Sequence, residues 1–193
     1  ARLQLGNLYL LSREIQKARE QAERVLAKEP HNPTGHLLMS SVYAIEKNLD
    51  QAISEAKKAI ELDPKKIEAY LHLASLYILK KDFTQAEHTF KEAIKVDERS
   101  MLAHYALADF YRRSGKSGLA ETEFLEVTKI SPKDPGAFLT LGNFYAYINR
   151  MEDAEKQFLK AIEVSPESIP IRIHLGDFYL RWGKKVKAFE AYR

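Results

Sequence analysis

Tyrosine recurs at an unbroken interval of 34 residues along the whole chain. It stands at Tyr9, Tyr43, Tyr77, Tyr111, Tyr145 and Tyr179. An alanine follows nine residues after every one of them, at Ala18, Ala52, Ala86, Ala120, Ala154 and Ala188. A fixed period of this length indicates a repeat architecture, in which each unit buries its apolar face only by stacking on its neighbours.

Each repeat is predicted to form two antiparallel helices. A small residue lies three positions before each tyrosine, at Gly6, Ser40, Ala74, Ala108, Gly142 and Gly176. In the first helix the small residue and the tyrosine share one face, and in the second helix the alanine shares a face with a larger residue four positions on, such as Phe90, Phe124 or Phe158. The small residues are expected to let the two backbones approach each other.

Prolines and polar residues mark where the helices should end and begin. Pro30, Pro64, Pro132 and Pro166 are expected to stop the second helices. Asn32, Ser100, Asp134 and Ser168 stand where the next helix needs an N-cap, and Pro33 and Pro135 suit the first helical position. Within the repeats, Asn48, Gly115, Asn149 and Gly183 are predicted to take the left-handed turn conformation.

These positions resemble the tetratricopeptide repeat (TPR) family over the whole chain. The resemblance implies an all-α fold, a right-handed α-solenoid formed by a single array over residues 1–193. The predicted repeats are 1–32 (with a slightly shortened first helix), 33–66, 67–100, 101–134, 135–168 and a truncated 169–193. The chain departs from the family pattern at Glu98, where proline is expected, and at Ala22 and Ala56, where a large residue is usual.

The resemblance also implies that the first helices line a concave groove that binds a protein or peptide. The candidate partner-binding residues are Asn7, Leu38, Ser41, Leu71, His72, Ser75, Tyr105, Asp109, Arg112, Arg113, Asn143, Tyr147, His174 and Asp177. The groove positions also include Leu11, Ile45, Leu79 and Arg181. The first three repeats are mostly aliphatic there, and the later ones are polar and aromatic. The alternative for each apolar position is packing between adjacent repeats.

Composition excludes several classes of function. Thirty basic and 27 acidic residues leave a net charge of +3, too small to indicate nucleic-acid binding. The chain has no cysteine, which fits a reducing cytoplasm, the favoured compartment, or a bacterial envelope. No apolar run is long enough to insert into a membrane, so this segment is not expected to span one. The start at Ala1 and the end at Arg193 inside an expected helix suggest a piece of a longer protein.

No catalytic, cofactor-binding or metal-binding residues are predicted. The segment from Ser114 to Ser117 reads Ser-Gly-Lys-Ser, the end of a phosphate-loop motif, but the earlier glycine is replaced by Phe110 and no strand precedes it. We therefore interpret the segment as a turn between helices. The six histidines form no pair spaced for zinc. The basic residues of the chaperone-binding TPR clamp are also missing, which disfavours that ligand.

The predicted function is a non-enzymatic scaffold or adaptor that binds a partner's peptide or helical segment in the groove. Two alternatives stay open: the substrate-recruiting arm of a larger enzyme such as a glycosyltransferase, and a component of a bacterial envelope or export assembly. The residues from Ile169 onward are locally basic and include Trp182, the only tryptophan, which suits an acidic partner or a junction with a further repeat. Exposed apolar ends could also lead to end-to-end self-association.

Overall fold

Twelve α-helices and no strand make up the chain, which confirms the all-α prediction. The computed structural model describes residues 1–193, in two compact units, Ala1–Ala106 and Leu107–Arg193. The first unit holds α1 (Arg2–Leu11), α2 (Ile15–Lys28), α3 (Pro33–Ile45), α4 (Leu49–Leu62), α5 (Ile67–Leu79) and α6 (Phe83–Val96). Helix α7 (Met101–Arg113) contributes to both units. The second unit holds α8 (Ser117–Ile130), α9 (Pro135–Tyr147), α10 (Met151–Val164), α11 (Ile169–Arg181) and α12 (Lys185–Tyr192).

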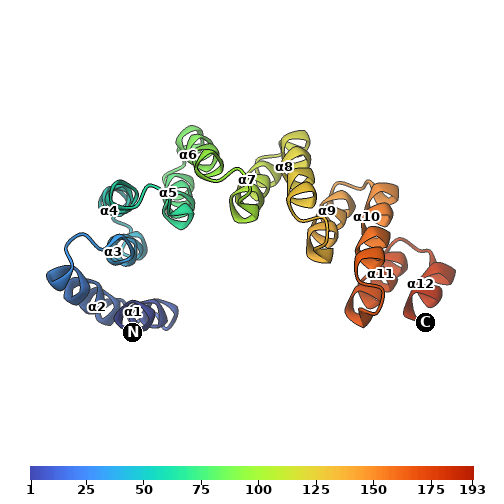
Figure 1. The fold of residues 1–193 in the computed structure, drawn as a ribbon, viewed down its shortest axis with the longest axis horizontal. Helices are drawn as coiled ribbons and strands as arrows, with labels where there is room; N and C mark the ends of the chain where they lie inside the picture. Colours follow the sequence, from blue (N-terminus) through green and yellow to red (C-terminus); the bar gives the residue numbers. More distant parts are fainter. The chain divides into compact units, whose positions relative to one another are not determined.

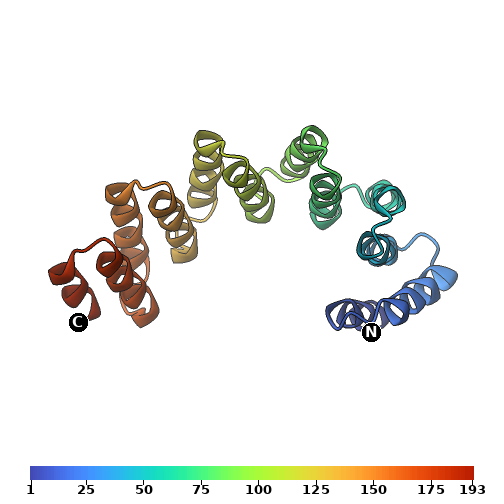
Figure 2. The same cartoon turned by 180° about the vertical axis from the view of Figure 1, so that it is seen from behind.

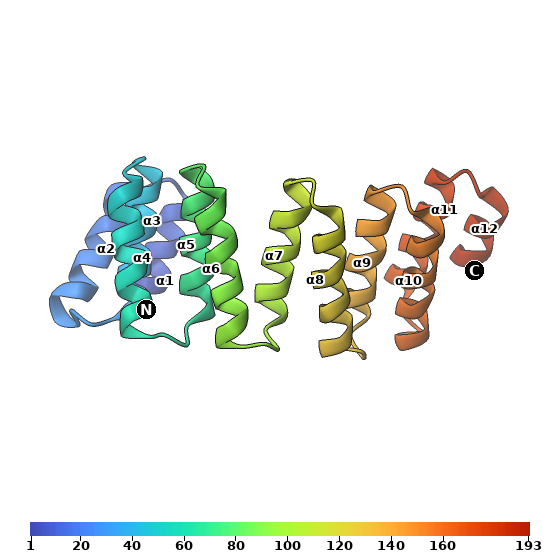
Figure 3. The same cartoon turned by 90° about the horizontal axis from the view of Figure 1, so that it is seen from above.

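Helices pair as hairpins within each unit. The first helix of a pair begins at Pro33, Ile67, Met101, Pro135 or Ile169, each the first residue of a predicted repeat. Figures 1 and 2 show these hairpins from opposite sides, and Figure 3 shows α3 beside α4 and α9 beside α10. Within the first unit, α1 also contacts α3, and α3 contacts α5. Within each unit, packing therefore links each repeat to the one that follows it.

Every hairpin turns at the fourth residue after the repeated tyrosine. That residue has a positive φ in all six repeats, at Arg13, Lys47, Lys81, Gly115, Asn149 and Gly183. The predictions for Gly115, Asn149 and Gly183 are confirmed, whereas the one for Asn48 is wrong, since Asn48 has a φ of −89° and precedes α4. The reason is a Schellman turn, in which Asn48 N donates to Tyr43 O at 2.9 Å and Lys47 N to Ala44 O at 3.0 Å. These two bonds require the left-handed residue at position 47.

Three of the four expected N-cap residues make a side-chain cap bond. The side chain of Asn32 accepts from Gly35 N at 3.0 Å, that of Ser100 from Ala103 N at 3.2 Å, and that of Asp134 from Gly136 N at 2.8 Å. Ser168 also stands at the N-cap position, before α11, but its side chain makes no cap bond. Pro33 and Pro135 begin their helices as expected.

A side chain near the start of four first helices reaches back to the preceding inter-repeat turn. His36, Tyr70, His104 and Arg172 contact the carbonyl oxygens of Pro30, Pro64, Glu98 and Pro166 at 2.9, 3.1, 3.1 and 3.0 Å. Carbonyls near a helix end lack an intrahelical donor, and these contacts supply one. Glu98 replaces the expected proline without loss of the contact, because only its backbone oxygen takes part.

The small repeated residues lie where a side chain of another helix packs directly against the backbone. All six repeated alanines are fully buried. A β-carbon on Gly142 would stand 2.5 Å from Cε1 of Phe158, and one on Gly6 would collide with the side chain of Leu38. The expectation that small residues permit close approach is therefore confirmed at these contacts.

Neighbouring repeats are joined by a tyrosine placed between charged side chains, an arrangement that we call a junction cluster. In the second unit, Tyr145 OH donates to Glu121 at 2.7 Å, and Arg150 pairs with the same carboxylate at 2.7 Å and lies 4.5 Å from the tyrosine ring centroid. Burial, together with the bond to Glu121, raises the pKa of Tyr145 well above its ordinary value of 10.

The junction clusters differ in charge arrangement. Glu155 accepts from Tyr179 OH at 2.6 Å and from Lys187 Nζ at 2.5 Å, as in the preceding cluster. The first unit reverses the charges: Arg19 lies 5.0 Å from the ring centroid of Tyr43 and pairs with Glu46 at 2.5 Å. The repeat position that holds Arg19 in the first unit thus holds a glutamate, Glu121 or Glu155, in the second unit.

Candidate functional site

Large apolar side chains stand exposed at one repeated position of the first helices, two residues after the tyrosine. In the first unit these are Leu11, Ile45 and Leu79, exposed by 82%, 49% and 61%, and in the second unit Tyr147 is exposed by 66%. We call the three residues of the first unit, Leu11, Ile45 and Leu79, the exposed row. Complete burial of an exposed aliphatic side chain of this size would gain about 1.5–3 kcal/mol. Exposed apolar side chains that recur in register are typical of a surface that a partner covers.

The predicted partner-binding residues fall into three groups by exposure. The exposed ones are Asn7, Ser75, Arg113, Asn143, Tyr147 and Asp177. The half-buried ones are Ser41, Leu71, His72, Tyr105, Asp109, Arg112 and His174. Leu38 alone is buried. Most of the predicted positions therefore present at least part of their side chain to solvent.

Leu38 is a core residue, and its prediction as a partner-binding residue is wrong. Its side chain is 3% exposed, packs with Ala22 and Met39, and fills the space over Gly6. Because Gly6 has no side chain, α1 leaves room there that a leucine from α3 occupies. For this position, packing between repeats is the correct alternative.

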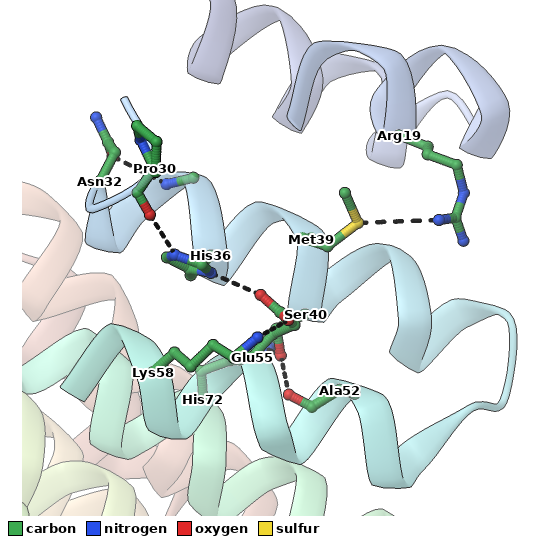
Figure 4. Close-up of polar contacts among 11 residues, drawn as sticks. Arg19, Pro30, Asn32, His36, Met39, Ser40, Ala52, Glu55, Lys58 and His72 are labelled. Carbon is green, nitrogen blue, oxygen red and sulfur yellow. Dashed lines mark hydrogen bonds and ion pairs between the residues drawn. The ribbon is translucent and has the colours of Figure 1, made fainter. Parts of the chain in front are cut away.

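His72 is held inside the contact between α3 and α5 (Figure 4). Ser40 Oγ donates its single proton to Ala52 O at 2.7 Å, so it must accept from His72 Nε2, which lies 2.9 Å away. This assigns the proton of the neutral ring to Nε2. Burial lowers the pKa of His72 below its ordinary value of 6.5. The Nε2 atom of His72 thus serves the fold, while the prediction that this half-buried residue also contacts a partner stays a prediction.

The charged side chains of α7 form ion pairs with one another. Asp109 receives Arg112 at 2.5 Å on one carboxylate oxygen and Arg113 at 2.6 Å on the other. The guanidinium of Arg112 also lies 5.1 Å from the ring centroid of Tyr147. The two arginines offered by the sequence for carboxylate recognition thus share the single carboxylate of Asp109, which leaves a net charge of +1 on the group.

A pocket of about 300 Å³ opens in the second unit between α9 and α11. It is lined by Asn143, Ala146, Tyr147, Met151, Phe178, Arg181 and Trp182. His174 Nε2 lies 2.9 Å from Asn143 Oδ1, at the side of this pocket. Burial and the charge of Arg181 lower the pKa of His174, so the ring is neutral at neutral pH and donates to the asparagine.

The sequence indicated only part of this pocket. Asn143 and Tyr147 were predicted from their place on a first helix. Ala146, Met151 and Phe178 were missed, because the pocket forms where one hairpin turn meets the next first helix, and periodicity within a single helix does not reveal such a meeting. Trp182 carried a signal as the only tryptophan of a basic segment.

A second pocket of about 300 Å³ lies in the first unit, between α4, α5 and α6. Its lining mixes charges of both signs, with Lys57, Glu61 and Glu92 around Tyr70 and Leu73. It shares no residue with the exposed row. The mixed charges do not select a ligand class.

The structure also places the motifs that were tested for chemistry. Residues 114–116 form the turn between α7 and α8, as predicted, with Gly115 at a φ of 71°, and Ser117 begins α8. No group of three or more potential metal ligands gathers anywhere in the chain. None of the twelve helices combines the length and apolar character needed to cross a membrane.

Comparison with known families agrees with this geometry. The family description "Tetratricopeptide repeat" matches residues 3–67, 43–109, 103–134 and 135–168. The chain is a tetratricopeptide-repeat protein. No curated protein matches the sequence of this TPR chain.

Solved TPR structures match the fold over most of the chain. The Thermus thermophilus TPR protein TTC0263 aligns with a TM-score of 0.64 and 22% identity, over 93% of this chain and 97% of its own. Pseudomonas aeruginosa pilF gives a TM-score of 0.68 at 16% identity, over 98% and 86%. YrrB, described as a TPR protein with an unusual peptide-binding site, gives 0.56 at 20% identity, over 95% and 90%. These likenesses confirm the TPR solenoid fold.

Proposed function

We propose that this TPR chain is a protein-interaction scaffold that binds a peptide or helical segment of a partner across the exposed row. The observation that carries the proposal is the recurrence of Leu11, Ile45 and Leu79 at one position of successive first helices, all exposed. In α3 and α5 the apolar residues three positions before the row, Val42 and Leu76, are almost completely buried, whereas the equivalent Leu8 of α1 is exposed. In α3 and α5 the exposed row is therefore not a by-product of a generally loose core.

The fold suits such a role because it holds the exposed row on rigid helices. Helices packed through buried alanines keep their side chains in place before a partner arrives, so binding loses little conformational entropy. The apolar side chains supply affinity. Asn7 and Ser75, exposed near the row, can hydrogen-bond to a peptide. YrrB, described as a TPR protein with an unusual peptide-binding site, supports the proposal by analogy.

The test is selection of peptides that bind the whole chain from a displayed random library, followed by affinity measurement on variants. Leu79→Asp should weaken the selected peptides at least tenfold, because it places a charge in the apolar contact and leaves the core intact. The matched control is Phe83→Asp, in the second helix of the same repeat, where the side chain is exposed by 54%. Circular dichroism should show unchanged helicity in both variants. Equal binding by both variants would refute the proposal.

A further inference from the structure

We propose that the pocket between α9 and α11 receives an aromatic side chain of the bound peptide, while Arg181 pairs with the carboxylate of an adjacent aspartate or glutamate. The inference rests on the proposed function and specifies the ligand class at the second unit. It requires three features: an aromatic wall, a cation without an acidic partner, and a surface that lets the peptide chain continue on both sides.

The wall of the pocket is aromatic and polarisable. Phe178 lies under it with its ring centroid 5.5 Å from that of Trp182, and Trp182 stacks on Tyr179 with an interplanar angle of 11°. Tyr147 and Met151 complete the lining. Aromatic rings favour tilted and offset contacts with other rings, and methionine sulfur adds favourable contacts with them. A volume of about 300 Å³ accommodates one side chain rather than a folded segment.

Arg181 is the charged group of the pocket, and no carboxylate of the chain neutralises it. Its one hydrogen bond runs from Nε to the backbone oxygen of Asp177 at 3.3 Å, which leaves the outer guanidinium nitrogens available. The Asp177 carboxylate accepts from Tyr192 OH at 2.7 Å instead. Lys184 and Lys185 follow in the sequence, so a carboxylate approaching Arg181 meets a locally basic segment. A guanidinium binds a carboxylate in a bidentate manner.

Arg113 provides the internal comparison. It occupies the same position of the repeat as Arg181, two repeats earlier, but Nε of Arg113 lies 2.6 Å from the Asp109 carboxylate. Arg113 therefore already has an ion-pair partner, which it shares with Arg112, whereas no such partner lies at Arg181. Substitution of Arg113 therefore removes a paired positive charge from this face of the repeats, whereas substitution of Arg181 removes an unpaired one.

The carboxylate belongs to a side chain within the peptide rather than to its C-terminus. Beyond the pocket the same surface continues, since Arg112 lies over the Tyr147 ring, and Ile173 is exposed on α11. At the side of the pocket next to His174, the oxygen of Asn143 accepts from that histidine, and the amide nitrogen of Asn143 is available to a peptide carbonyl. A partner that crosses this surface passes through the pocket, with its aromatic residue as an anchor.

The experiment uses Trp182 as the reporter, because it lines the pocket and is the only tryptophan of the chain. The probes are blocked octapeptides of glycine and serine with a central aspartate–phenylalanine pair or the matched asparagine–phenylalanine pair. A third peptide carries phenylalanine as its last residue with a free carboxylate. The whole chain is titrated while tryptophan emission is recorded. We expect the aspartate peptide to bind at least about tenfold more tightly than the asparagine peptide.

Arg181→Gln should abolish that preference, whereas Arg113→Gln should leave it unchanged. Equal affinity of the wild-type chain for the aspartate and asparagine peptides would overturn the role of Arg181. Tighter binding of the peptide with the free terminal carboxylate would overturn the assignment to an internal residue. If display-selected peptides depend on Leu79 but the aspartate–phenylalanine peptide leaves Trp182 emission unchanged, this pocket is refuted while the proposed function stands. Failure of every peptide, selected or designed, would refute both.

Discussion

The hydroxyl group of Ser40 fixes the tautomer of a neutral histidine in the next repeat. Its proton goes to Ala52 O, so the Ser40 oxygen can only accept from His72. Burial disfavours the charged form of the half-buried ring and lowers the pKa of His72. A residue that the sequence presents as a partner-binding candidate thus acts as a packing residue between α3 and α5.

The stability of the first unit should consequently fall as the pH drops below about 6.5. The pKa of His72 is lower in the folded chain, so the unfolded chain binds more protons below pH 6.5 and gains free energy on acidification. The loss continues until the pH reaches the folded pKa and amounts to at most about 1.4 kcal/mol per pH unit. Urea unfolding at about pH 7.5 and about pH 5.5 measures it.

The same measurement on His72→Gln should show a smaller pH dependence, because glutamine does not titrate but can still donate to Ser40. His31→Gln serves as the control, since His31 is exposed in the turn before α3. The assignment fails if both variants keep the dependence of the original chain.

Sequence reasoning at this scale failed where a partner lies on another helix. Leu38 and Leu79 are both aliphatic residues of first helices, yet one fills the space above Gly6 and the other is exposed. Helical periodicity gives the direction of a side chain around its own axis. It does not show that a glycine on a neighbouring helix opens room for the side chain, so the candidate site was only partly predictable.

Helix pairs depend on contacts between a small residue and a ring. Gly142 faces Phe158, and Gly176 faces Tyr192, at equivalent positions of consecutive repeats. Any side chain larger than hydrogen would collide with the ring, because both belong to packed helices. Such contacts set the closest approach of the two helices of a hairpin.

Gly142→Ala should therefore lower the free energy of unfolding by about 1–3 kcal/mol, the usual effect of overpacking. Gly118→Ala is the matched change, since Gly118 lies in the first turn of α8 with no atom within 4 Å of an added β-carbon. Alanine should there leave stability unchanged or raise it by up to about 1 kcal/mol. Urea titration of both variants decides, and a loss of equal size in both would contradict the packing argument.

At the element scale most of the fold could be predicted. The 34-residue period placed the hairpins, and the prolines placed the first residues of α3 and α9. The errors concern single backbone positions: Lys47 rather than Asn48 adopts the left-handed conformation, although asparagine has the better intrinsic preference for it. The two Schellman hydrogen bonds outweigh that preference, because they fix the turn relative to Tyr43.

Contacts within each unit join helices that are adjacent or next but one in the chain. In the second unit they connect α8 with α9, α9 with α10, α10 with α11, and α11 with α12. A structure held by such local contacts has a stability that is close to a sum of repeat and neighbour terms. Damage at one repeat should accordingly remain local.

Phe158→Ala provides the test. Its side chain is 1% exposed and contacts the ring of Phe178 at 4.8 Å between centroids, so truncation should cost about 3–5 kcal/mol. Native-state hydrogen exchange should show faster exchange of amides in α9, α10 and α11. Amides in α1 to α4 should keep their rates. Acceleration of equal size throughout the chain would indicate global cooperativity and contradict the expectation.

The junction clusters have a consequence for how such a gene can change by recombination. Loss of residues 33–66 would preserve the 34-residue period, so the hairpins on either side would keep the same repeat register. Lys80 occupies in its repeat the position that Glu46 has in the one before. In the shortened protein Arg19 would meet Lys80 beside Tyr77, and a cation would face a cation where Glu46 now binds Arg19 at 2.5 Å. The charges at each junction thus suit the present order of the repeats. Unequal recombination that removes a repeat would place like charges side by side and cost electrostatic free energy.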